Sequence, residues 1–147
     1  MLGTVTVLRR YPVKSMLGAD VDESDVSRSG LAGDRHLAVV SRRTGKVASA
    51  KYPRLWRDLL TLSAEALDDD VRITLPDGKT VCSADADIDV LSALLNEPVA
   101  LTATPLPGAS VDRAVPEAVL REGVKAQVPA EIIEIGAGAA LRNEKSR

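Results

Sequence analysis

The chain has 147 residues, the length of a single domain, and 45% of them are hydrophobic while only 2% are aromatic. It contains no phenylalanine, so its core is expected to be built from aliphatic side chains. A net charge of −2 argues against a general nucleic-acid binder, and the single cysteine, Cys82, excludes an intrachain disulfide and a cysteine-rich metal site.

The same features predict a cytoplasmic protein. A single cysteine suits a reducing compartment, and the first ten residues lack the apolar centre of a signal peptide. No apolar run approaches the roughly 20 residues that a membrane-spanning helix needs. We therefore expect neither a membrane nor nucleic acid among the partners.

The first half of the chain predicts short strands separated by tight turns. Its β-branched and apolar residues alternate in part, and turn-forming residues divide them into runs. Tyr11-Pro12 ends the first strand, because proline cannot donate to a ladder and holds the preceding residue extended. Thr44-Gly45 predicts a hairpin between the last two strands. The predicted strands cover residues 3–10, 19–28, 35–41 and 46–50.

The second half predicts further strands and three helical segments. Pro53 suits the first turn of a short helix that ends near Leu60. Pro76-Asp77-Gly78-Lys79 is a strong hairpin signal. Residues 114–121 predict one or two helical turns, and residues 136–147 predict a loose polar end. The predicted strands cover residues 61–67, 71–75, 80–83, 99–104 and 131–135.

Residues 85–96 predict the best helix, with Asp85 or Asp87 as its cap and Pro98 beyond its end. Its apolar side chains form one stripe, which either covers the strands or faces a partner. The stripe consists of Ile88, Leu91, Leu94 and Leu95. The whole pattern favours a mainly β fold, a small β-barrel of about seven short strands with one covering α-helix.

Two turns place cations beside backbone N–H groups: Lys14-Ser15 follows the first predicted strand, and Arg35 begins the third. An ammonium, a guanidinium, a hydroxyl and turn amides suit a phosphate or a carboxylate. If the two turns face one another, Lys14, Ser15 and Arg35 form one anion-binding pocket. The alternative is solubilising charge, with Arg35 paired to a carboxylate such as Asp34 or Asp20.

Two neighbouring residues are candidates for moving a proton. His36 is the only histidine, and its ordinary pKa of about 6.5 suits general acid–base work, although a partly buried strand histidine is the simpler interpretation. Asp34 is a possible base, but aspartate commonly stabilises its own turn by accepting backbone N–H groups. Cys82 has no helix N-terminus or basic neighbour to lower its thiol pKa, so we interpret it as a half-buried strand residue.

Residues 42–57 are the most basic stretch of the chain and include Tyr52 and Trp56. Basic and aromatic residues together are used on single-stranded nucleic acid, but the acidic remainder favours Trp56 as a bulky plug in an aliphatic core. The stretch is also placed to extend the anion pocket. Its basic residues are Arg42, Arg43, Lys46, Lys51, Arg54 and Arg57.

The spaced set of segments resembles the N-terminal β-barrel domain of MOSC proteins, the molybdenum cofactor sulfurase C-terminal-like proteins, which include the mitochondrial amidoxime-reducing component. The segments that carry the resemblance are Tyr11-Pro12-Val13-Lys14-Ser15, Gly18, Gly30-Leu31-Ala32-Gly33-Asp34-Arg35, Val39-Val40, Gly45 and Ser49 to Pro53-Arg54-Leu55. The resemblance implies a barrel domain over residues 1–104, and residues 105–147 then form a Pro- and Gly-punctuated C-terminal extension.

The resemblance implies that Lys14, Ser15 and Arg35 occupy positions whose residues help to bind the phosphate of a pterin cofactor in that family. The cysteine that ligates molybdenum or carries sulfur lies in a second, MOSC domain, and Cys82 does not match it. We therefore expect a stand-alone barrel that binds a phosphorylated or carboxylated small molecule, molybdopterin-like if the link is close, with a partner protein or as a homo-oligomer.

Two other functions remain open from the sequence. One is a small enzyme that acts on an anionic substrate held by the same basic pocket, with His36 or Asp34 moving a proton. The other is a structural fragment whose pocket is empty.

Overall fold

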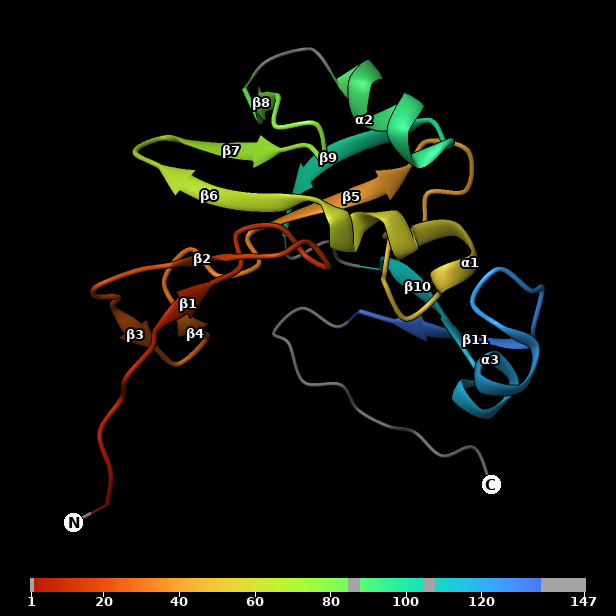
Figure 1. The fold of residues 1–147 in the computed structure, drawn as a ribbon, viewed down its shortest axis with the longest axis horizontal. Coiled ribbons are helices and arrows are strands. Elements are labelled where there is room, and N and C mark those ends of the chain that lie inside the picture. The colour runs from red at the N-terminus through yellow and green to blue at the C-terminus, as the bar shows by residue number, and fades with distance from the viewer. Residues whose placement is uncertain (1, 85–87, 105–107, 136–147) are drawn as a thin grey trace.

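The computed structural model describes residues 2–84, 88–104 and 108–135, and this part of the chain is mainly β (Figure 1). It contains eleven strands, three α-helices and one 3-10 helix. The helices are α1 (Pro53–Trp56), α2 (Ile88–Leu95) and α3 (Pro116–Glu122), and the 3-10 helix is η1 (Arg57–Thr61). None of these described helices is both long and apolar enough to cross a bilayer. The predicted mainly β class is confirmed.

The strands form five antiparallel sheets. Four sheets have two strands each: β1 (Arg9–Arg10) with β2 (Ala19–Asp20), β3 (Val26–Ser27) with β4 (Gly30–Leu31), β5 (Leu37–Ser41) with β9 (Val99–Ala103), and β10 (Ser110–Ala114) with β11 (Ala130–Glu134). The fifth joins β6 (Ser63–Leu67), β7 (Asp70–Thr74) and β8 (Thr80–Cys82). Within the described residues these sheets do not close into a barrel.

Single bridges connect the sheets to one another. Val13 pairs with Leu37 at the start of β5, and Leu17 pairs with Ser63 at the start of β6. Further along the same edge of β5, Val40 pairs with Val47, whose N–H in turn donates to the Ser110 carbonyl at 2.8 Å. The segment around Val47 therefore joins β5 to β10.

The main core is aliphatic, as the composition predicted, and it lies between β5, β6, β7 and the helices. Leu59, Leu62, Ile73 and Leu91 are completely buried in it. Trp56 is also buried there and fills the space that an aliphatic core leaves. Leu91 and Leu95 bring the apolar stripe of α2 into this core, so that face covers strands and is not free for a partner.

A smaller cluster links the C-terminal segment to the rest of the molecule. Ala114, Ala118 and Val128 form its buried centre. Tyr52 packs against this cluster and also against the main core. The division at residues 104 and 105 stays a prediction.

Two strand predictions in the first half were wrong in extent. Of residues 3–10, only Arg9 and Arg10 form a strand, and Val5 and Val7 are exposed. Their β-branched side chains favour an extended backbone, but a strand also needs a second strand to hydrogen-bond with. The pairing with β2 ends where Val21 N–H donates to the Leu8 carbonyl. Residues 19–28 form two strands of two residues, separated by residues 21–25, three of which are acidic.

The predicted hairpin after β5 is reduced to one bridge, at Val47. The full partner of β5 is β9, which matches it over five residues, while Val47 turns its own N–H to β10. Strand β10 was not predicted, and α3 lies close to the predicted helical turns. The helix cap at Asp85 or Asp87 and the loose end at 136–147 lie outside the described residues.

Candidate functional site: a basic pocket between two turns

The two turns singled out in the sequence meet through their backbones. Lys14 N–H donates to the Leu37 carbonyl at 2.9 Å, and Leu37 N–H donates to the Pro12 carbonyl at 3.1 Å. Arg35 N–H donates to the Tyr11 carbonyl at 2.6 Å. Pro12 and Val13 are buried beneath this contact, which fixes the turn that carries Lys14 against the start of β5.

Ser15 and Arg35 both adopt the left-handed backbone conformation, with φ of 67° and 50°. This conformation costs a non-glycine residue roughly 1–2 kcal/mol and persists only where the surroundings impose it. At Ser15 the hydroxyl oxygen accepts the Ala50 N–H at 3.1 Å, which anchors the turn to a third segment. Three described non-glycine residues have such a φ: Asn96 follows the end of α2, and the other two, Ser15 and Arg35, are predicted ligands. Strain of this kind is often found at functional sites.

Lys14 is a partly buried cation that has no carboxylate within ion-pair distance among the described residues. Among the described residues its ammonium forms no ion pair, and its side-chain hydrogen bond is a long one of 3.5 Å to Ser15 Oγ. Burial lowers the pKa of Lys14 from 10.5 to about 8, and the positive charges of Lys51 and Arg35 lower it in the same direction. The charges of Lys14, Lys51 and Arg35 therefore repel one another, and Lys14 has no carboxylate beside it to offset this repulsion.

Arg35 faces solvent, with 68% of its side chain exposed. Its nearest carboxylate is Asp34, at 3.9 Å from Nε to Oδ2, a separation at which an exposed pair contributes little. The alternative partner, Asp20, instead pairs with Arg9 at 2.7 Å. Arg35 therefore keeps donor groups available toward solvent.

The two proton-transfer candidates stabilise the turn through backbone contacts. Asp34 Oδ1 accepts the Tyr11 N–H at 2.9 Å and so ties the second turn to the first. His36 Nδ1 donates to the Gly33 carbonyl at 2.7 Å. His36 precedes β5 and is exposed, so the expectation of a partly buried strand histidine was wrong; the side chain follows the turn rather than the strand.

Lys51 belongs to the site, and the basic stretch was its only sequence signal. Its charge acts on Lys14, and its N–H donates to the buried Ser49 hydroxyl at 3.3 Å. Other cations of that stretch are engaged elsewhere: Arg43 pairs with buried Glu97 at 2.7 Å, and Lys46 pairs with Asp112 at 2.8 Å.

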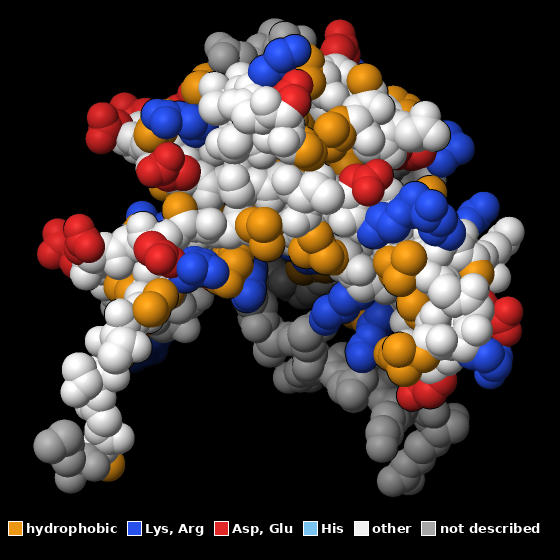
Figure 2. Space-filling view, in the orientation of Figure 1, with side chains coloured by type: hydrophobic (Ala, Val, Ile, Leu, Met, Phe, Trp, Pro, Cys, Tyr) orange, Lys and Arg blue, Asp and Glu red, His pale blue; other side chains and the backbone are white. Residues whose placement is uncertain are grey.

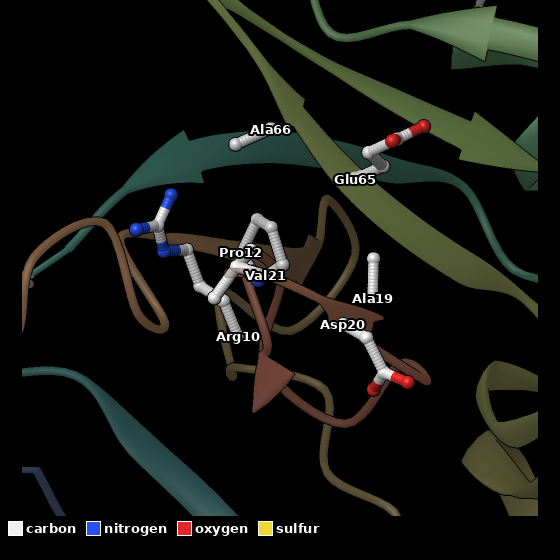
Figure 3. Close-up of a pocket in the computed structure, with 7 residues that line it drawn as sticks. All are labelled: Arg10, Pro12, Ala19, Asp20, Val21, Glu65 and Ala66. Atoms are coloured by element: carbon white, nitrogen blue, oxygen red, sulfur yellow. The ribbon is translucent and has the colours of Figure 1, made fainter. Parts of the chain in front are cut away.

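A second hollow, of about 60 Å³, lies beside β1 and β2 (Figure 3). The guanidinium of Arg10 points away from the carboxylates of Asp20 and Glu65, which also line this hollow. Arg10 Nε is buried without a hydrogen-bond partner in the described structure, while Nη2 donates to Ser24 Oγ at 3.0 Å. Two carboxylates and the small volume make this hollow unsuited to an anionic ligand.

The described residues form a mainly β protein in which Lys14, Arg35 and Lys51 lie close enough for their charges to interact, beside two turns with strained backbone. No cluster of three or more potential metal-ligating side chains occurs among the described residues. Residues 2–98 match the sequence model of the family described as the MOSC N-terminal beta barrel domain. The match covers most of the chain, and the chain belongs to this family. A search of curated proteins found no match.

Proposed function

We propose that the protein is a binding module for a phosphorylated or carboxylated small molecule, held by Lys14, Ser15 and Arg35, with Lys51 adding charge. The observation that carries the proposal is the partly buried Lys14 ammonium, which has no carboxylate within 4 Å among the described residues. A buried charge without a partner is costly, and a bound oxyanion supplies the missing counter-charge.

Family membership makes the phosphate of a molybdopterin-type cofactor the first ligand to test. An ammonium, a hydroxyl and a guanidinium fit such a phosphate. Cys82 lies on β8, in the three-stranded sheet rather than in the two turns. In this proposal the chain therefore binds only the phosphate of the cofactor, and a partner ligates the metal. A partner protein or a second copy of the chain would cover the open side at Arg35. A cytoplasmic location is part of the same proposal.

We favour binding over catalysis because of what Asp34 and His36 contact. Asp34 Oδ1 accepts the Tyr11 N–H, and His36 Nδ1 donates to the Gly33 carbonyl. Both groups support the turn that presents Arg35. A base that abstracts a substrate proton must face the substrate within hydrogen-bond reach, and this role is not needed to explain either residue.

The test is a thermal-shift and calorimetric screen of phosphate, nucleotides and pterins. The variants are Lys14→Ala and Arg35→Ala, and Arg28→Ala, in the exposed β3–β4 turn, is the control. Phosphate-containing ligands should raise the melting temperature of the wild type and of Arg28→Ala, and this shift should be lost in Lys14→Ala. A shift that survives Lys14→Ala places the ligand elsewhere and overturns the proposal.

A further inference from the structure

An open groove of about 370 Å³ lies next to the basic pocket. Residues 50, 51 and 53 form one side of it, and five residues between 113 and 120, on β10 and α3, form the other. Its volume is within the roughly 300–1,000 Å³ of small-molecule sites. The β10–α3 side lies beyond residues 2–98, so the family match does not account for this groove.

The two sides of the groove are held in place by backbone and core contacts. Ala114 N–H donates to the Lys51 carbonyl at 2.9 Å. Tyr52, between two lining residues, packs against both the main core and the cluster around Ala118. The groove is therefore part of the folded structure and needs no ligand to form.

The lining combines apolar walls with a cationic edge. Pro53, Pro116 and Val119 are apolar, and Leu120 remains 87% exposed at the rim. The cations are Lys51 and Arg113, and neither forms an ion pair with another described residue. Figure 2 shows Lys or Arg and hydrophobic side chains next to one another where β10 and α3 meet the main body. Such a lining suits a molecule with an apolar body and a negative group.

The groove and the basic pocket share an edge. Ala50, which lines the groove, donates its N–H to Ser15 Oγ in the pocket. Lys51 also lines the groove, and its charge acts on Lys14. An anion at Lys14 would therefore lie beside Lys51, which is itself one of the residues that line the groove.

We propose that the groove binds the apolar body of a soluble phosphate ester whose phosphate lies at Lys14, Ser15 and Arg35, beside the charge of Lys51. This inference rests on the proposed function. It adds that the group esterified to the phosphate is compact and apolar and packs against Pro53, Pro116 and Val119. Arg113 at the far edge favours ligands that carry a second negative group.

The test compares inorganic phosphate with phenyl phosphate by isothermal titration calorimetry. Wild type should bind phenyl phosphate about tenfold more tightly, since apolar contact in a pocket contributes that order of discrimination. Leu120→Asp should remove most of this advantage and leave the affinity for inorganic phosphate unchanged. Val26→Asp, at another exposed apolar position on β3, is the matched control and should behave as wild type.

The outcomes separate this inference from the proposed function. Two results would refute binding of the apolar body in the groove and leave phosphate binding at Lys14 intact. One is equal affinity of the wild type for the two probes, and the other is tighter binding of phenyl phosphate that survives Leu120→Asp. Tight phenyl phosphate binding that survives Lys14→Ala overturns the proposed function and the shared ligand with it. Binding of neither probe overturns both.

Discussion

Replacing Lys14 by methionine is expected to stabilise the unliganded protein at neutral pH. Methionine keeps the length of the buried side chain and removes its charge. The pKa of Lys14 falls from 10.5 to about 8 on folding, chiefly through burial. At about 1.4 kcal/mol per pKa unit, charging this group costs the folded state about 3 kcal/mol. That cost is the upper limit of the stabilisation.

The pH dependence has a defined sign. Below pH 8 the lysine is protonated in both states, so the whole penalty is present. Between pH 8 and 10.5 the unfolded chain binds the proton and the folded protein does not, so the stability of the wild type rises with pH. Above pH 10.5 the penalty is gone. The advantage of Lys14→Met should therefore shrink across this window and vanish at its upper end.

Urea unfolding in phosphate-free buffer between pH 7 and 10.5 measures this effect. Lys79→Met is the control, because the Lys79 side chain is 81% exposed and its replacement should change the free energy of unfolding by less than about 0.5 kcal/mol at any pH. If Lys14→Met is no more stable than wild type at pH 7 and the difference between them does not vary with pH, Lys14 carries no burial penalty and the reasoning fails.

Three further predictions concern the frame of the site. Asp34→Asn should keep both the Tyr11 contact and phosphate binding, whereas Asp34→Ala should weaken phosphate binding several-fold in calorimetry; equal loss in both variants would point to the charge of Asp34 instead. Gly18→Ala should lower the free energy of unfolding by about 2 kcal/mol or more, because its Cβ would lie 2.2 Å from the Arg10 carbonyl oxygen, and an unchanged urea midpoint would contradict this close approach. Glu97→Gln should cost about 1–2 kcal/mol in the same assay, because the buried carboxylate accepts hydrogen bonds from Ser41 and Arg43, and a neutral result would mean that these bonds contribute nothing net.

Elements with strong local signals were predictable from the sequence. The turn at Pro76–Lys79 joins β7 to β8, with Leu75 N–H donating to the Lys79 carbonyl, as the turn residues indicated. The apolar spacing of α2 predicted a helix with one apolar stripe, and the structure shows that Leu91 and Leu95 of this stripe are buried in the main core. In each case a few adjacent residues determine the structure.

Elements that depend on distant partners were not predictable in this way. Strand β10 has the sequence Ser-Val-Asp-Arg-Ala, which carries little strand signal, and it forms because Val47 and β11 offer edges to it. The N-terminal residues before Leu8 show the reverse: their sequence is typical of a strand, but no neighbouring strand hydrogen-bonds with them. Pairing across a sheet is decided by tertiary context more than by local preference.

In the candidate site, too, some residues could be predicted from local sequence and others only from the fold. Proline and glycine turns with Lys14, Ser15 and Arg35 are visible in the sequence, and so is the carboxylate of Asp34 as a turn stabiliser. For Lys51 the sequence indicated only the basic stretch of residues 42–57, because only the fold shows which of its cations acts on Lys14. The groove is likewise invisible, since its walls come from segments some sixty residues apart.

The most direct test of an anion site at Lys14 is the pKa of that side chain, followed by NMR with ¹³C-labelled lysine, without ligand and with saturating sulfate. Sulfate is suitable because it does not titrate in this range. The structure gives a pKa of about 8 without ligand, and a bound anion beside the ammonium should raise it toward the ordinary 10.5. A pKa that starts near 10.5, or that stays at about 8 in saturating sulfate, would contradict the account.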